Sequence, residues 1–169
     1  LSLNAKLERE NVNAFCAGLV LFSLATSTLF TPMPIFISEI TRAAGLPASV
    51  VFAVFVLSSA GGVAGDMVAG ARSDQIMGKS SLGRIVLLRC LLASLLIAVF
   101  QITAYSVVLA TVILVAMGFA YALFLVQTLS LSMELIPAGK AGLFNVLIGI
   151  GGACGSFIGP LIAQLFGFL

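Results

Sequence analysis

Gly70-Ala-Arg-Ser-Asp74-Gln-Ile-Met-Gly78-Lys79-Ser-Ser-Leu-Gly-Arg84 is the stretch that decides the fold, because it gathers charges and glycines between two long apolar runs. Such a segment is typical of a tight cytoplasmic turn between two transmembrane helices, since Lys and Arg concentrate on the inner side of a membrane. Gly70 lets the first helix end tightly, and Gly78 permits a positive φ in the turn. We therefore expect the turn to hold Asp74 at a defined place.

The composition requires a membrane. Hydrophobic residues make up 61% of the 169-residue chain and charged residues only 8%, so a soluble globule would expose too much apolar surface. Roughly 20 apolar residues of helix cross a bilayer core, and long continuous runs differ from the short alternating strands of a β-barrel. The sequence therefore predicts an all-α integral membrane protein. The expected spans are 13–38, 48–71, 85–103, 106–133 and 142–168.

The placement of basic residues predicts a cytoplasmic N-terminus. With that orientation the outer segments carry only Arg42. The inner segments carry Lys6, Arg9, Arg72, Lys79, Arg84 and Lys140. We expect a cytoplasmic linker over 1–12 and a multi-pass transmembrane half-domain over 13–169, in the plasma membrane. Because the chain begins with Leu and its fifth span reaches the last residue, we interpret it as a fragment.

Residues that carry chemistry in enzymes are scarce. The chain has no His, and Cys16, Cys90 and Cys154 lie in different apolar runs at spacings that suit no metal. No nucleophile elbow or phosphate-binding loop is present. We expect no enzymatic activity, no cofactor, no metal and no nucleic-acid partner.

Two charges lie within apolar runs, Asp66 and Arg89. A charge at mid-membrane costs about 2.5–3.5 kcal/mol or more, so persistent ones are usually paired or functional. Counted from the predicted helix ends, both lie roughly 8 Å inside the cytoplasmic boundary, which predicts an ion pair between adjacent antiparallel helices. The alternative is that Arg89 snorkels to the headgroups while Asp66 faces water or a helix end. A proton-coupling role for Asp66 is a further hypothesis.

The segment 70–79 resembles the cytoplasmic signature of the major facilitator superfamily of secondary transporters. That signature joins the second and third helices of each six-helix half. The residues that match it in order are Gly70, Asp74, Gly78 and Lys79. The resemblance implies that Asp74 acts as a latch toward a helix of the other half and stabilises the outward-facing state. Lys79 and Arg84 would support it.

The resemblance also implies which part of a transporter this chain forms. The opening linker and the turn over 134–140 look like the second half, helices seven to eleven. The implied fold is a half-bundle of five transmembrane helices. Its implied partners are the lipid bilayer, helices one to six, the final helix and a small solute. The implied function is secondary active transport by alternating access, of a drug-like or other neutral or hydrophobic compound, with proton coupling.

Glycines at four-residue spacing share one face of a helix and let another backbone approach closely. They are Gly61 and Gly65 in the second span, and Gly151, Gly155 and Gly159 in the fifth, where Pro160 follows directly. These faces support an alternative function, that of a helical membrane protein that assembles or scaffolds through its glycines without transporting. In the first span, Pro32 and Pro34 predict either a bend or break or a simple helix exit.

Polar side chains within the spans are candidates to line a solute cavity near the bilayer midplane. They are Thr26, Thr28, Tyr121, Gln127 and Asn145. For each of them, hydrogen bonding to a neighbouring helix is the alternative role. With both charges placed at shallow depth, no deep basic residue marks an anionic solute, which favours a neutral or hydrophobic one.

Overall fold

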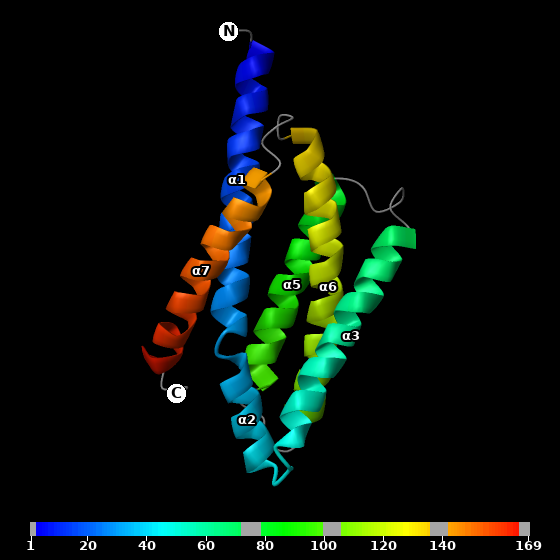
Figure 1. Cartoon of the computed structure of the whole chain (residues 1–169), viewed down its shortest axis with the longest axis vertical. Coiled ribbons are helices and arrows are strands. Elements are labelled where there is room, and N and C mark those ends of the chain that lie inside the picture. The colour runs from blue at the N-terminus through cyan, green and yellow to red at the C-terminus, as the bar shows by residue number, and fades with distance from the viewer. Residues whose placement is uncertain (1–2, 72–78, 100–105, 136–141, 166–169) are drawn as a thin grey trace. The chain divides into compact units, whose positions relative to one another are not determined.

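The structure, a computed structural model, describes residues 3–71, 79–99, 106–135 and 142–165 (Figure 1). The described residues form α-helices joined by short turns, without a β-strand. The helices are α1 (Leu3–Phe30), α2 (Met33–Ala43), α3 (Ser49–Ala71), α5 (Lys79–Val99), α6 (Ser106–Leu135) and α7 (Gly142–Leu165). The predicted all-α fold class is therefore confirmed.

Five stretches in the described part of the chain are long and apolar enough to cross a membrane. They are Val12–Ala43, Ser49–Ala71, Ser81–Val99, Val107–Met133 and Gly142–Leu165. These confirm the predicted number of spans and a multi-pass membrane protein. The third span begins at Ser81, four residues earlier than the predicted start at residue 85.

The first span is broken at Thr31 and Pro32, between α1 and α2. The Thr31 amide and hydroxyl both donate to the Ser27 carbonyl oxygen, at 3.0 and 2.7 Å, which closes the last turn of α1. Proline has no N–H and cannot continue the helix ladder, whereas Pro34 is tolerated in the first turn of α2, where no such bond is needed. The predicted break is confirmed. At its other end α1 begins at Leu3, within the segment expected to be a linker.

A glycine-capped turn joins α2 to α3. Gly45 has a φ of 68°, the left-handed region that an L-residue with a side chain seldom adopts. The Gly45 amide donates to the Arg42 carbonyl and the Leu46 amide to the Thr41 carbonyl, each at 3.0 Å. These two hydrogen bonds form the Schellman motif that ends a helix, and Pro47 then prevents the helix from continuing.

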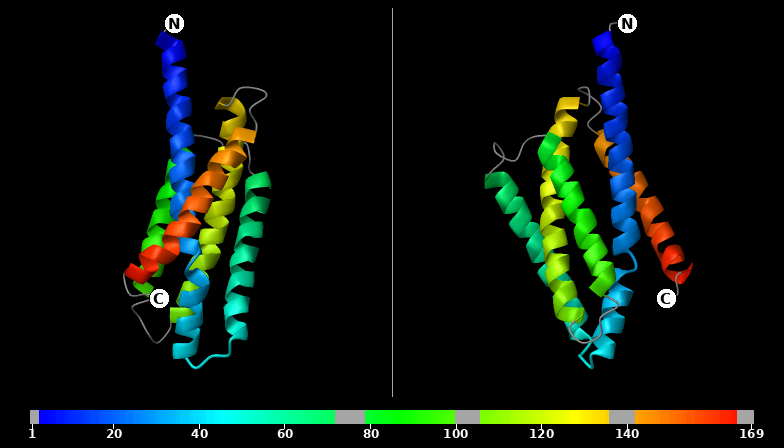
Figure 2. Two further views of the ribbon diagram at one scale, coloured as in Figure 1. Left: turned by 60° about the vertical axis from the view of Figure 1, so that its left-hand side comes forward. Right: turned by 180° about the vertical axis from the view of Figure 1, so that it is seen from behind.

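The chain divides into two compact units, Leu1–Pro34 with Leu131–Leu169, and Ile35–Ser130. In the first unit α1 and α7 lie side by side (Figure 2). Gly151, Gly155 and Gly159 of α7 face Val20, Leu24 and Thr28 of α1 in that order. Because both series advance by four residues in the same direction, the two helices run parallel.

In the second unit α6 contacts both α3 and α5 (Figure 1). Gly61 and Gly65 of α3 face Val115 and Phe119 of α6, again advancing together, so these helices are parallel. Between α5 and α6 the order is reversed. Ser81 meets Gln127 and Arg89 meets Tyr121, so these helices are antiparallel.

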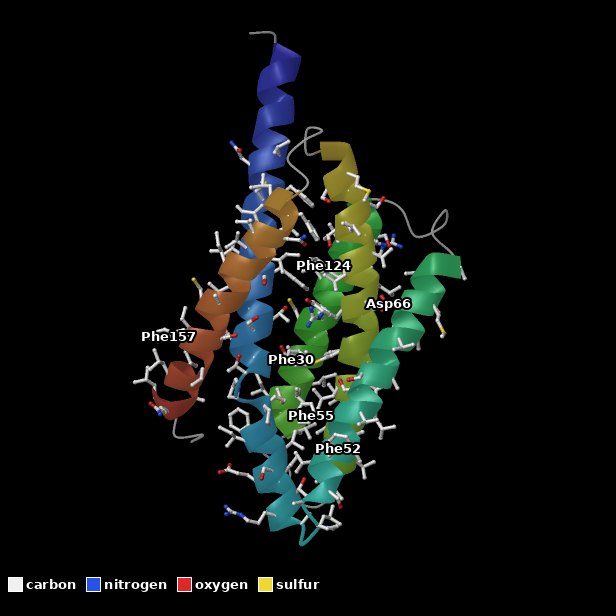
Figure 3. The ribbon with its side chains drawn as sticks, viewed as in Figure 1. Phe30, Phe52, Phe55, Asp66, Phe124 and Phe157 are labelled. Carbon is white, nitrogen blue, oxygen red and sulfur yellow. The ribbon has the colours of Figure 1, made fainter. Side chains whose placement is uncertain are left out.

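These directions are those of a chain that crosses a membrane back and forth. The first and fifth spans run the same way, as do the second and fourth, while the third opposes the fourth. Large apolar side chains point outward, for example Phe52 at 75% and Phe157 at 74% exposure, and Phe157 projects on the side of α7 away from α1 (Figure 3). Such exposure suits helices whose surroundings are lipid tails, and would be unusual on a soluble protein.

Candidate functional site

Two pairs of polar side chains make contacts between α5 and α6, Ser81 with Gln127 and Arg89 with Tyr121, and these four residues are called here the polar cluster. Arg89 is 5% exposed and Gln127 is 7% exposed, within spans that are otherwise almost wholly apolar. Ser81 and Arg89 are about 2.2 turns apart on α5, and both contact α6. Tyr121 and Gln127 come from α6, the helix with the most buried span.

Arg89 lies over the face of Tyr121. Its guanidinium carbon is 4.8 Å from the centroid of the Tyr121 ring, within the range of a cation–π interaction. Such a contact contributes about 0.5–2 kcal/mol, the larger value applying when both groups are desolvated. The ring therefore orients the guanidinium and offsets part of the cost of holding a cation in the membrane.

The depth of this contact differs from the expected one. Arg89 lies eight residues after Ser81 and ten before Val99, so it is about 12 Å along the helix from the start of its span. Tyr121 lies 14 residues after Val107 and 12 before Met133, close to the centre of the fourth span. Arg89 thus lies farther from the start of its helical span than expected from the sequence, and the absence of a deep basic residue stays a prediction.

The other contact of the polar cluster lies nearer to the start of α5. The Gln127 amide nitrogen donates to the Ser81 hydroxyl oxygen at 2.9 Å, which ties α6 to the first turns of α5. The neighbouring Thr128 is 1% exposed and donates back to the Phe124 carbonyl of its own helix at 2.8 Å. Gln127 thus links α5 and α6, whereas the Thr128 hydroxyl is hydrogen-bonded within α6.

The remaining cavity candidates are in the first unit. Thr28 belongs to the α1–α7 contact, where its backbone faces Gly159, and its hydroxyl is buried with no hydrogen-bond partner among the described residues. Thr26 is half-buried on α1, and Asn145 is exposed on α7. The structure therefore brings together Tyr121 and Gln127, and not the whole predicted set.

The predicted partners Asp66 and Arg89 have different surroundings. Asp66 is exposed on α3, where it makes no ion pair with another described residue (Figure 3). Arg89 is buried on α5 and is brought together with Tyr121 instead of Asp66. The physical reason is that α6, which contacts both α3 and α5, presents its own aromatic ring to the guanidinium.

Part of the latch loop falls outside the described residues, namely Asp74 and Gly78. Gly70 is the penultimate residue of α3, and a Cβ built there meets nothing within 4 Å. Lys79 is the first residue of α5, and Arg84 is exposed one turn further on. The loop thus joins α3 to α5, and the latch role of Asp74 stays a prediction.

The predicted glycine faces are both occupied within the chain. A Cβ at Gly65 would lie 2.5 Å from the Phe119 carbonyl oxygen, and one at Gly159 would lie 2.5 Å from the Thr28 carbonyl oxygen. Gly61, Gly151 and Gly155 make equally close contacts, with the backbones of Val115, Val20 and Leu24. Pro160 lies inside α7, next to the last of these contacts.

Sequence reasoning missed several residues that support these contacts. Gly118 of α6 faces the Ser58 carbonyl, and Ser58 in turn donates its hydroxyl to the Leu114 carbonyl at 3.1 Å. In the other unit, Ser23 donates to the Ile148 carbonyl at 2.7 Å. Ser81 of the polar cluster was also missed. Its signal was a polar side chain eight residues before Arg89 on α5.

Comparisons with protein-family models, curated proteins and solved structures find no match to this chain. A functional conclusion therefore depends on the residues themselves.

Proposed function

We propose that this chain is one half of a secondary active transporter, which moves a small solute across the plasma membrane by alternating access against a partner half. The N-terminus would be cytoplasmic, and a proton would be the coupling ion. The proposal joins the resemblance of the loop over 70–79 to the major facilitator superfamily with the geometry of the polar cluster.

The observation that carries the proposal is the contact of the buried Arg89 with Tyr121, within two adjacent candidate spans. Ionisable side chains inside transmembrane segments are rare and expensive, and they commonly mark the path of a solute or ion. In secondary transporters the solute site lies near the bilayer midplane. A buried cation between two spanning helices supports a solute site there.

The alternative, assembly through glycine faces, is weakened by the same structure. Gly61 and Gly65 contact α6, and Gly151, Gly155 and Gly159 contact α1. A partner protein cannot use these glycines unless the contacts within the chain open. The faces that remain outward carry large apolar side chains, which suit lipid as well as a partner.

Solute uptake tests the proposal. Vesicles from cells that produce the chain together with its partner half would be given an organic acid, an organic amine and a neutral drug-like compound, with and without an imposed proton gradient. We expect saturable, chain-dependent uptake of one class, driven by the gradient. Arg89→Gln should lose it, and Asp74→Ala should reduce it by shifting the balance between inward-facing and outward-facing states.

The matched control is Arg42→Gln, which removes an exposed cation at the end of α2. It should leave uptake unchanged at equal amounts of protein. Two results together would overturn the proposal in favour of a scaffold. No solute class would show chain-dependent uptake, and substitution of the contact glycines would impair only assembly.

A further inference from the structure

We propose that this chain associates with a second copy of itself, and that the outward face of α3 in one copy packs against the outward face of α5 in the next. The proposal goes beyond the transport function and does not depend on it. Its basis is a pair of opposite charges, Asp66 and Arg84, which are exposed on these two faces.

Both charges lie on helices that are long and apolar enough to cross a membrane. Asp66 belongs to the span Ser49–Ala71 and Arg84 to the span Ser81–Val99, and neither makes an ion pair with another described residue. About one turn away from them, Val63 and Leu87 are apolar and exposed. A charge on an apolar outward face is disfavoured in lipid, and an opposite charge on a neighbouring helix offsets that cost.

The two charges lie at nearly the same level, which can be measured along α6 because α6 contacts both helices. Gly65, the residue before the carboxylate, lies against α6 at Ala122. Ser81, three residues before the arginine, contacts Gln127 of the antiparallel α6. The arginine is therefore near the level of residue 124 on α6, within about one helical turn of the carboxylate. Copies that cross the membrane in the same direction would keep these levels matched.

The two faces also match in shape. Counted from its charge, each face repeats exposed residues at intervals of three, four, three and four. On α3 these residues are Asp66, Val63, Ser59, Val56 and Phe52, and on α5 they are Arg84, Leu87, Leu91, Ser94 and Ala98. Because α3 and α5 run in opposite directions, the two series align residue by residue when the faces are packed together. Small residues then oppose large ones, since Ser59 meets Leu91 and Ala98 meets Phe52.

The serines on these faces suit a contact between helices. Ser59 donates its hydroxyl to the Phe55 carbonyl at 2.9 Å, and Ser94 donates to the Cys90 carbonyl at 3.0 Å. Each hydroxyl is thus bonded within its own helix, so packing of the two faces buries no unpaired donor. Small residues of this kind are common where membrane helices approach each other closely.

The charges also decide which faces meet. A contact between two α3 helices would oppose two Asp66 carboxylates, because both copies cross the membrane in the same direction, and like charges repel. Contact of α3 with α5 opposes a carboxylate and a guanidinium instead. Such a contact joins different faces of the two copies, so it repeats from copy to copy as a ring or a row.

Disulfide cross-linking between differently tagged copies tests the proposal. In a background without native cysteines, one full chain carries Val63→Cys and the other Leu87→Cys, and the two are reconstituted together in lipid vesicles and oxidised. We expect a cross-linked heterodimer. Ala64→Cys is the matched control, because Ala64 is exposed at the same level but points about 100° away around α3. It should give only the background of random collisions.

Charge reversal makes the result specific. Asp66→Arg on the Val63→Cys copy should reduce the yield of the cross-link about ten-fold or more, because two cations then meet. Arg84→Asp on the Leu87→Cys copy should restore the yield, since the pair is then reversed. Glu39→Arg, which reverses an exposed acid on α2, should have no effect.

Three results would each overturn the proposal. They are equal cross-linking from positions 63 and 64, a yield that Asp66→Arg leaves unchanged, and failure of Arg84→Asp to restore the yield. Circular dichroism checks that every variant is helical. If Asp66→Arg does not fold, the comparison of positions 63 and 64 in the parent background still decides.

Discussion

A buried arginine stacked on a tyrosine is the feature of this molecule with the most consequence at the scale of single residues. Arg89 and Tyr121 come from different helices, and each lies several turns from the start of its own candidate span. Neither residue is informative alone, because a tyrosine and an arginine are common in membrane proteins near the interface. Their contact within two candidate spans is what points to a function.

Replacing the aromatic ring should destabilise the chain. Tyr121→Leu keeps an apolar side chain but removes the face on which Arg89 lies, so the free energy of unfolding should fall by about 0.5–2 kcal/mol. Tyr121→Phe is the matched control, because it keeps the ring and removes only the hydroxyl. Reversible unfolding in mixed detergent and SDS micelles, followed by circular dichroism, measures the free energy of unfolding of both variants. Equal losses in the two variants would contradict a cation–π contact.

The hydrogen bond between Gln127 and Ser81 should appear as a coupling energy. A double-mutant cycle of Gln127→Leu and Ser81→Ala isolates the bond of 2.9 Å from the other effects of each substitution. Interhelical hydrogen bonds in membrane proteins couple by about 0.6 kcal/mol on average, so we expect a value of that order. Additive effects of the two substitutions on unfolding would show that the bond contributes nothing.

At the scale of helices, the close contacts depend on the absence of side chains. A Cβ at Gly155 would overlap the Leu24 carbonyl of α1 and lie 2.9 Å from the Ser27 Cβ, whereas one at Gly149 of the same helix meets nothing within 4 Å. The two glycines therefore have opposite roles in α7. One permits contact, and the other only costs backbone entropy.

Alanine substitution should separate these roles by sign. Gly155→Ala should lower the free energy of unfolding by about 1–3 kcal/mol, because backbones of α1 and α7 must move apart. Gly149→Ala should leave it unchanged or raise it by up to about 0.5–1 kcal/mol, since alanine favours the helix. The same unfolding assay applies. A stabilised Gly155→Ala variant would mean that α1 and α7 do not touch there.

Helices were easier to predict than their contacts. Apolar length fixed the number of spans, and Pro32 located the break after Phe30 because a residue without an N–H cannot continue the ladder. The helix α5 begins before the predicted span over 85–103, because Lys79, Ser81 and Arg84 suggested a loop although all three lie on the helix. Polar residues in a first helical turn carry no periodic signal that separates them from a loop.

Contacts between helices could be predicted only where a physical rule is local. The four-residue spacing of glycines indicates a face that accepts a close backbone, and Gly65 and Gly155 do lie at such faces. No rule in the sequence says which helix supplies the partner. The expected pair of Asp66 with Arg89 failed to appear for that reason, since charge alone did not reveal that Tyr121 would cover the guanidinium.

At the scale of the whole molecule, the predicted orientation follows from charge alone and is open to test. In a variant without native cysteines, Ala44→Cys in the turn between α2 and α3 should react with a membrane-impermeant maleimide added to intact cells. Ser73→Cys, in the basic loop over 70–84, should react only after the cells are made permeable. The reverse pattern would mean that the N-terminus lies outside.

The central claim is that Arg89 lies deep in the membrane, and its neighbour Cys90 measures this directly. Cys90 is exposed on α5 and is the next residue in the chain, so a spin label there reports the depth of that level once Cys16 and Cys154 are replaced by Ala. Power saturation in bilayers compares collisions with oxygen, which concentrates in the lipid core, and with a water-soluble nickel complex. We predict high oxygen and low nickel accessibility, at a depth of about 12 Å from the start of the span. A label that meets the nickel complex as readily as one at an interface would place Arg89 among the headgroups and contradict the proposed site.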